Sequence, residues 1–239
     1  MSGHSKWASI KHKKGAADAK RGKTFSKLSK AITVSVKEGG PDLAMNFGLR
    51  LAIDKAKAAN MPKDNIERAI ERGKGGSSEG ALASAVYEGM GPGGVAIVVE
   101  ALTDNPNRTI GSLKTIFNKA GGNLDAKVLW MFDRRGVIEI EDVNTLDDHD
   151  LFELELIEAG AMDILREGDA ILIVTEIPHL HSVASVVEEH QLIPENVGLA
   201  YLPKDIIELN GEDIEKLRVF IEKLEEDEDV DSVFINASI

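Results

Sequence analysis

A glycine-rich turn runs directly into an aliphatic segment in Gly89-Met-Gly-Pro-Gly-Gly-Val-Ala-Ile-Val-Val-Glu-Ala-Leu102. The turn matches the GxGxxG pattern of dinucleotide-binding loops, but such a loop must follow a strand and open a helix. Here it is followed by residues 95–102, which have the composition of a strand. Residues 85–88 before the turn have the same character, so the stretch predicts a β-hairpin.

Residues before the hairpin have helical periodicity instead. Phe25, Leu28, Ile32 and Val36 recur at steps of three and four, which places them on one face of a helix over residues 23–37. Lysines occupy the opposite side, and Gly39-Gly-Pro41 ends the helix.

Two further short helices are expected before residue 75. Asp42 is the expected N-cap of the first, and Met61-Pro62 opens the second, which ends at Gly73. The expected buried residues are Leu43, Phe47 and Leu51 in the first helix and Ile66, Ala69 and Ile70 in the second. Residues 73–80 are rich in glycine and serine and read as a linker.

Residues after the hairpin alternate between helical and strand patterns. A helix with Ile110, Leu113 and Phe117 inward precedes an expected third strand at 128–132. Strands at 137–141, 162–166, 170–175 and 197–202 and helices at 151–159 and 180–190 follow in the order βαββαβ, which is the ferredoxin-like unit. A tail with a strand at 206–209, a helix at 212–226 and a strand at 233–236 ends the chain.

The fold class is therefore expected to be α+β and multidomain, with an N-terminal three-helix domain and two ferredoxin-like α/β domains, one inserted in the other. The tail needs a partner sheet, and the sheet of residues 81–133 is incomplete by itself. We expect a basic arm and helical domain over 1–75, a discontinuous α/β domain of 81–133 plus 204–239, and an inserted domain over 134–203. Three consecutive domains fit the pattern nearly as well.

Charge is distributed unevenly along the chain. Residues 1–74 contain 17 basic and 7 acidic residues, a net charge of +10, whereas residues 75–239 contain 11 basic and 34 acidic residues, a net charge of −23. Residues 1–37 alone hold ten basic residues and one acidic residue, Asp18. Like charges at this density repel one another, and a polyanion such as a nucleic acid is their natural partner.

The candidate nucleic-acid-binding residues lie in this basic segment. They are Lys6, Trp7, Lys11, His12, Lys13, Lys14, Lys20, Arg21, Lys23, Lys27, Lys30 and Lys37. Lysines opposite an apolar face are also typical of an ordinary solvated helix. Trp7 can stack on a base or fix the arm by an apolar contact, and His12 can bind phosphate or be exposed.

The remaining motifs indicate no catalytic chemistry. The chain has no cysteine, and its six histidines form neither an HExxH motif nor another cluster. Thr103-Asp-Asn-Pro-Asn-Arg-Thr109 is expected to cap the following helix, with ligand or RNA binding as the alternative. The acidic run of residues 225–229 is interpreted as a solvated helix end. We expect a protein that is not an enzyme and has no cofactor and no metal.

Several longer motifs resemble the YebC/PmpR family, which includes the mitochondrial translational activator of cytochrome c oxidase. They are Gly3-His-Ser-Lys-Trp7, Ile10-Lys-His-Lys-Lys14, Arg21-Gly-Lys-Thr-Phe-Ser-Lys-Leu28, Asn60-Met-Pro-Lys-Asp-Asn-Ile-Glu-Arg-Ala-Ile70, Tyr87-Glu-Gly, Gly93-Gly-Val-Ala and residues 103–109. The resemblance implies a helical domain and two α/β domains, the second domain being split by the third.

The resemblance also implies a cytoplasmic, non-enzymatic regulator. Bacterial members are described as probable transcriptional regulators that bind promoter DNA, which we take as the first expectation. Other members act in translation on ribosomes stalled at stretches such as proline runs, so the alternative is a translation factor that binds ribosomal or transfer RNA. A protein-interaction scaffold with acidic partner-binding sheets is a third possibility. No run of 18 or more apolar residues predicts a membrane span.

Overall fold

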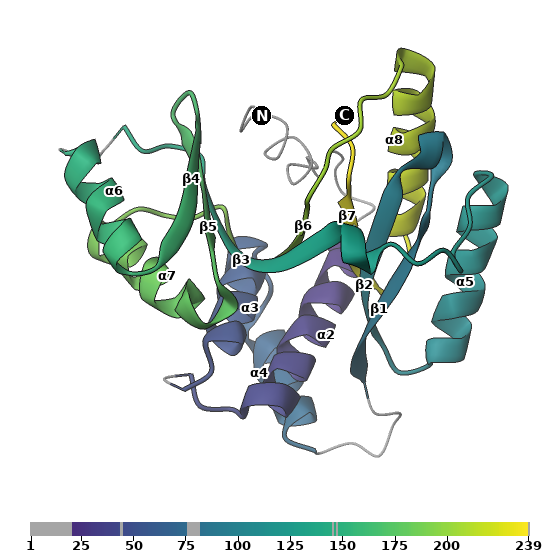
Figure 1. Ribbon diagram of the computed structural model, residues 1–239. Coiled ribbons are helices and arrows are strands. Elements are labelled where there is room, and N and C mark those ends of the chain that lie inside the picture. Colours follow the sequence, from purple (N-terminus) through teal and green to yellow (C-terminus); the bar gives the residue numbers. More distant parts are fainter. Residues whose placement is uncertain (1–20, 44, 76–81, 145, 147, 239) are drawn as a thin grey trace. The chain divides into compact units, whose positions relative to one another are not determined.

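The computed structural model describes residues 21–43, 45–75, 82–144, 146 and 148–238 (Figure 1). The architecture is α+β, with an N-terminal helical region and two antiparallel sheets, as the sequence predicts. The described residues fall into two compact units, one of residues 21–129 and 208–235 and one of residues 130–207 and 236–238. The helical region and the sheet that follows it lie in the same compact unit. A domain boundary at residues 75–81 therefore stays a prediction.

Helices α2 (Arg21–Gly39), α3 (Phe47–Ala58) and α4 (Lys63–Gly73) form the helical region. Its core contains the predicted residues Ile32, Val36, Ile66 and Ala69. The predicted face of α3 was wrong. Leu49, Ala52, Ile53 and Ala56 are the buried residues of this helix, and Leu43 lies outside it and is 45% exposed.

The N-cap of α3 also differs from the predicted one. Asn46, and not Asp42, caps the helix: its side-chain oxygen accepts the Leu49 N–H at 3.0 Å. The Asn46 amide also donates to the carbonyls of Ser35 and Gly40, each at 2.7 Å. An amide can donate to the end of α2 while it caps α3, whereas a carboxylate only accepts. The helix therefore begins at Phe47 and leaves Leu43 outside it.

The first sheet has the order β1-β2-β7 and is antiparallel throughout. Its strands are β1 (Ala83–Met90), β2 (Ala96–Thr103) and β7 (Val230–Ile235). The predicted hairpin is confirmed, with the 3-10 turn Pro92–Gly94 between β1 and β2 and positive φ angles at Gly93 and Gly94. A nucleotide-binding helix does not follow this loop.

Both faces of β2 are covered, which explains its continuous aliphatic run. Helices α5 (Pro106–Lys119) and α8 (Gly211–Glu225) lie on one side of the sheet, and α2 lies against β2 from the other (Figure 1). Phe117 and Phe220 join α5 to α8 edge to face, with ring centroids 4.9 Å apart.

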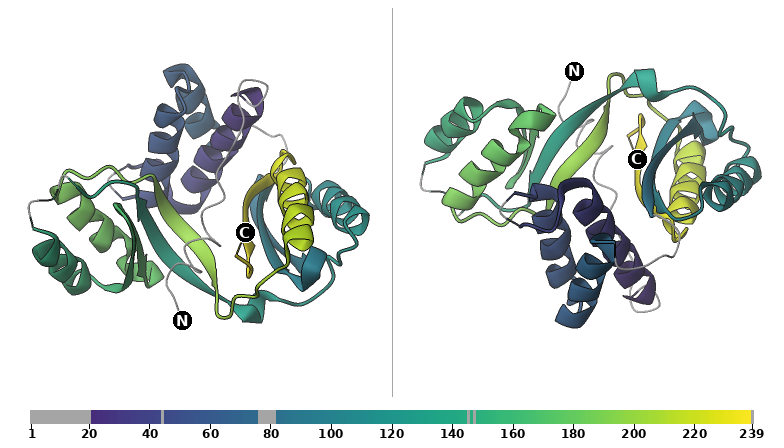
Figure 2. Two further views of the ribbon diagram at one scale, coloured as in Figure 1. Left: turned by 90° about the horizontal axis from the view of Figure 1, so that it is seen from above. Right: turned by 90° about the horizontal axis from the view of Figure 1, so that it is seen from below.

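The second sheet has the order β4-β5-β3-β6 and is also antiparallel. Its strands are β3 (Phe132–Ile140), β4 (Ala161–Glu167), β5 (Ala170–Thr175) and β6 (Asn196–Pro203). Helices α6 (His149–Glu158) and α7 (Leu180–Glu189) lie side by side, as Figure 2 shows. Element order and strand order together are those of the predicted ferredoxin-like unit.

Two predicted strands were wrong. Residues 129–131 form a 3-10 turn, because the Glu88 carboxylate accepts the N–H groups of Val128 and Leu129 at 2.7 and 2.8 Å and removes them from any ladder. The strand that follows is β3 of the second sheet. Residues 206–209 contribute only a single parallel bridge, between Ile207 and Ala237.

The close crossing of α2 and α4 leads to a test. A Cβ atom added at Gly73 would lie 2.5 Å from the Cβ atom of Val36 and 2.9 Å from the Thr33 carbonyl oxygen. We expect Gly73→Ala to lower the free energy of unfolding by about 1–3 kcal/mol through overpacking. Gly111→Ala in α5, where the new methyl meets nothing within 4 Å, is the control and should change it by no more than about 1 kcal/mol, in the stabilising direction. Denaturant titrations in which both variants behave alike would contradict this packing.

Candidate nucleic-acid interface

The structure describes only part of the predicted interface. Lys6, Trp7, Lys11, His12, Lys13, Lys14 and Lys20 lie outside the described residues. Arg21 and Lys23 belong to the first turns of α2, where only the helical backbone is described. Lys27, Lys30 and Lys37 are described with their side chains.

Lys27 and Lys30 face the C-terminal end of α8. The Lys27 Nζ donates to the carbonyl oxygen of Glu225 at 2.6 Å, and the Lys30 Nζ donates to that of Glu228 at 2.9 Å. Glu225 is the last residue of α8, where carbonyl groups lack helical partners and the helix dipole is negative. Both lysines therefore stabilise the packing of α2 against the sheet that α8 covers.

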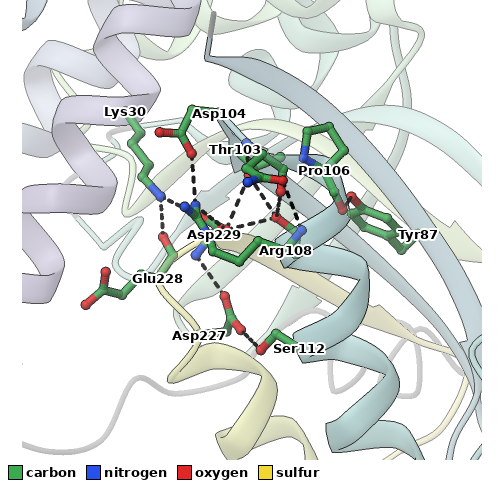
Figure 3. Close-up of polar contacts among 12 residues, drawn as sticks. Lys30, Tyr87, Thr103, Asp104, Pro106, Arg108, Ser112, Asp227, Glu228 and Asp229 are labelled. Carbon is green, nitrogen blue, oxygen red and sulfur yellow. Dashed lines mark hydrogen bonds and ion pairs between the residues drawn. The ribbon is translucent and has the colours of Figure 1, made fainter. Parts of the chain in front are cut away.

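Lys30 also forms an ion pair with the buried carboxylate of Asp229. Its Nζ lies 2.6 Å from Oδ1, and Asp229 is only 5% exposed (Figure 3). The Nη2 of Arg108 lies 3.1 and 2.9 Å from the two carboxylate oxygens. The Thr109 hydroxyl lies 2.8 Å from Oδ2, and the Thr103 hydroxyl lies 3.3 Å from it. One carboxylate thus joins α2, the end of β2 and the start of α5.

These contacts determine the ionisation of Asp229. Burial acts to raise the pKa of this carboxyl group, but hydrogen bonds from Lys30, Arg108 and Thr109 outweigh burial and lower the pKa from 3.8 to about 2. Asp229 in turn raises the pKa of the Arg108 guanidinium. Burial, with the nearby Asp229 charge, raises the pKa of the Tyr87 phenol. The carboxylate is therefore ionised throughout the physiological pH range.

A pocket of about 510 Å³ lies beside this cluster. Its lining residues are Lys30, Asp104, Arg108, Ser112, Asp227, Glu228 and Asp229. The Ser112 hydroxyl is hydrogen-bonded to the Asp227 carboxylate, and Arg108 also pairs with Asp104 at 2.9 Å. No histidine lines the pocket, so Ser112 lacks the base that a nucleophilic serine needs. No metal-ligating cluster occurs among the described residues.

Sequence reasoning missed Arg108 and Asp229. The interpretation of residues 225–229 as a solvated helix end was wrong for Asp229, which is buried and doubly paired. The predicted capping role of residues 103–109 is confirmed, because the Asn105 side chain accepts the Arg108 N–H at 3.1 Å. Thr103 and Thr109, at the two ends of that loop, were the available signal for a buried carboxylate, since two hydroxyls near a strand end can bind one.

The other helices of the N-terminal region carry little net charge. Residues 38–75 contain seven basic and six acidic residues. Several of these form short-range ion pairs, including Lys57 with Asp54 at 3.0 Å and Lys74 with Glu71 at 2.6 Å. Lys37 is exposed, and its Nζ lies 3.3 Å from the Leu82 carbonyl oxygen. The excess positive charge of the region therefore lies in residues 1–37.

Two family models together match nearly the whole chain. Residues 5–76 match the family model described as the TACO1/YebC protein N-terminal domain, and residues 82–237 match the TACO1/YebC second and third domain. The chain belongs to the TACO1/YebC family.

TACO1/YebC relatives resemble the chain over its whole length. A probable transcriptional regulatory protein of Thermoanaerobacter pseudethanolicus is 46% identical, covering 100% of this chain and 98% of the relative. A probable transcriptional regulatory protein of Desulforapulum autotrophicum is 47% identical, and the match covers 100% of this chain and 97% of the relative. The crystal structure of a conserved hypothetical protein of Aquifex aeolicus has a TM-score of 0.84 at 39% identity and covers 95% of this chain and 94% of that one.

The Asp229 cluster predicts how stability depends on pH. Because the folded pKa of about 2 lies below the ordinary value of 3.8, the contribution of Asp229 is fully present above pH 3.8 and is lost as the pH falls towards 2. Asp229→Asn leaves Lys30 and Arg108 facing a neutral amide, so we expect it to lower the free energy of unfolding at pH 7 by about 2–3 kcal/mol.

The same variant should lose less stability than the wild type when unfolding is measured between pH 5 and pH 2.5. Asp54→Asn is the control, since Asp54 is 66% exposed and its pair with Lys57 lies at the surface. It should change stability by no more than about 0.5 kcal/mol. Parallel pH profiles for the wild type and Asp229→Asn would contradict the assignment.

Proposed function

We propose that this member of the TACO1/YebC family regulates transcription by binding DNA through its basic N-terminal segment. The distribution of charge carries the proposal: residues 1–37 hold ten basic residues and one acidic residue. The names of the relatives, probable transcriptional regulatory proteins, support it. The protein is proposed to act in the cytoplasm as a binding protein, without catalysis, cofactor or metal.

The ion pair of Lys30 and the carbonyl contact of Lys27 change how the phosphate contacts are assigned. Both ammonium groups already bind the end of α8, and Asp229 holds Lys30. The proposal therefore gives the phosphate contacts to the remaining basic groups of the segment and treats Lys27 and Lys30 as residues that position it. These groups are Lys6, Lys11, Lys13, Lys14, Lys20, Arg21, Lys23 and Lys37, with His12 as a further phosphate donor and Trp7 stacked on a base.

The acidic remainder of the chain restricts how a nucleic acid can approach. Residues 75–239 carry a net charge of −23, which repels phosphate and favours contact through the basic end. Phosphate contacts alone confer little sequence specificity, so we expect weak discrimination between DNA sequences.

An RNA target is the second candidate, because RNA presents the same phosphate charge. The protein would then be a translation factor whose basic segment binds ribosomal or transfer RNA, for example on ribosomes stalled at proline runs. Binding of duplex DNA and transfer RNA at one salt concentration separates the two. At least about tenfold tighter binding of the transfer RNA would favour translation over transcription.

Salt dependence tests the assignment of the phosphate contacts. If about six phosphates are neutralised, log K should fall with log salt at a slope of about −5. Replacing Lys11, Lys13 and Lys14 together by glutamine should make that slope shallower by about 3 and weaken binding of every sequence to a similar extent.

The matched control replaces Lys57, Lys63 and Lys74 by glutamine. These three lysines are exposed, and each lies within 3.5 Å of a carboxylate oxygen in its own helical region. The control removes the same charge and should change the slope by less than about 1. Equal effects of the two triple variants in fluorescence anisotropy would contradict the assignment, and no DNA binding at low salt would overturn the proposed function.

A further inference from the structure

Helix α6 is apolar on two opposite sides. Phe152 and Leu156 are fully buried on the side that faces its own sheet. Leu151, Leu154 and Ile157 recur every three residues on the opposite side and are 47%, 53% and 57% exposed. A helix with apolar residues all round is normally covered on both sides.

The neighbouring edge strand also carries an exposed apolar side chain. Helix α6 packs against β4, which lies at the end of the strand order and has an unpaired edge in the described sheet (Figure 1). Met162 of β4 is 55% exposed. By contrast, Val219 is the sole large apolar side chain that is exposed on the described helix α8. Single exposed apolar residues are ordinary, whereas a row of them marks an interaction site.

The segment that carries the row is strongly acidic. Residues 148–169 contain eight acidic residues and one basic residue, Arg166. Arg166 is held by Glu153, with its Nε 2.6 Å from the carboxylate, and Glu155 pairs with the His190 Nε2 at 2.5 Å. Glu158 and Asp163 have no ion pair within the described part of the chain, so their charges are directed to solvent.

We propose that this face of α6, comprising Leu151, Leu154, Ile157 and Glu158, is a docking surface for a basic polypeptide segment. The segment fits as an amphipathic helix whose apolar side chains pack on the leucines and isoleucine while its lysines or arginines pair with the acidic rim. Charge complementarity selects this occupant. Nucleic acid is repelled by the carboxylates, and a second copy would bring two acidic faces together.

The inference is independent of the proposed nucleic-acid function. It uses residues of the second sheet unit, and none of the basic groups of residues 1–37. Loss of DNA binding would leave it intact, and its own failure would leave the proposed function intact.

The test uses the full-length protein and a fluorescent synthetic amphipathic helix built only from leucine and lysine. A companion peptide has each leucine replaced by serine and keeps the same charge. We expect the leucine–lysine peptide to bind, and the companion to bind at least about tenfold more weakly, because the apolar anchors supply part of the affinity.

Surface variants locate the binding. Leu154→Ser combined with Ile157→Ser should weaken binding of the leucine–lysine peptide about tenfold or more. Val219→Ser, at an equally exposed apolar position of α8 (56% exposed), is the control and should leave it unchanged. Circular dichroism verifies that the double variant keeps its helix content. If the helix content is lost, a second double variant, Glu158→Gln with Asp163→Asn, is used instead. This variant alters only exposed charges, and it should also weaken binding of the leucine–lysine peptide.

Each other outcome overturns the proposal. Absence of binding, equal binding of the two peptides, or equal effects of the α6 and Val219 variants would show that the row does not anchor a basic segment. Sedimentation would show that a second copy covers the face instead if the wild type is a dimer and the Leu154→Ser and Ile157→Ser variant is a monomer.

Discussion

The carboxylate of Asp229 connects more of this molecule than any other side chain described above. It binds Lys30 from α2, Arg108 from α5 and the hydroxyls that flank the loop between β2 and α5, while its own backbone carbonyl accepts the Leu102 N–H at 2.7 Å. A buried carboxylate without cations would be strongly destabilising. The position of the basic helix α2 on the first sheet is therefore tied to the charge of one residue at the opposite end of the sequence.

This interaction changes the meaning of the charge distribution. The basic segment and the acidic remainder are not separate, because Lys27 and Lys30 meet the negative end of α8 and Asp229 within one compact unit. The remaining charge differs between the N-terminal segment and helix α6. The excess positive charge lies towards the N-terminus, which suits phosphate, and the acidic surface of α6 is interleaved with apolar side chains, which suits a basic protein segment.

Local patterns in the sequence predicted most of the fold. The aliphatic run after the glycine turn predicted the hairpin, and the βαββαβ order predicted the second sheet, because periodicity and turn chemistry are local properties. The errors came from single polar contacts that the hydrophobic pattern does not record. Glu88 turned an expected strand into a 3-10 turn, Asn46 replaced Asp42 as a cap, and Asp229 pairs with a lysine 199 residues away. Nothing in the acidic composition of residues 225–229 distinguishes such a carboxylate from its solvated neighbours.

A double-mutant cycle between Lys30 and Asp229 tests the central claim most directly. The free energy of unfolding would be measured for the wild type, Lys30→Met, Asp229→Asn and the double variant at pH 7. If the ion pair holds α2 in place, the two single effects are not additive and differ from the double effect by about 1–3 kcal/mol. Additive effects, equal to the sum within about 0.5 kcal/mol, would show that Lys30 and Asp229 act separately and would contradict the account.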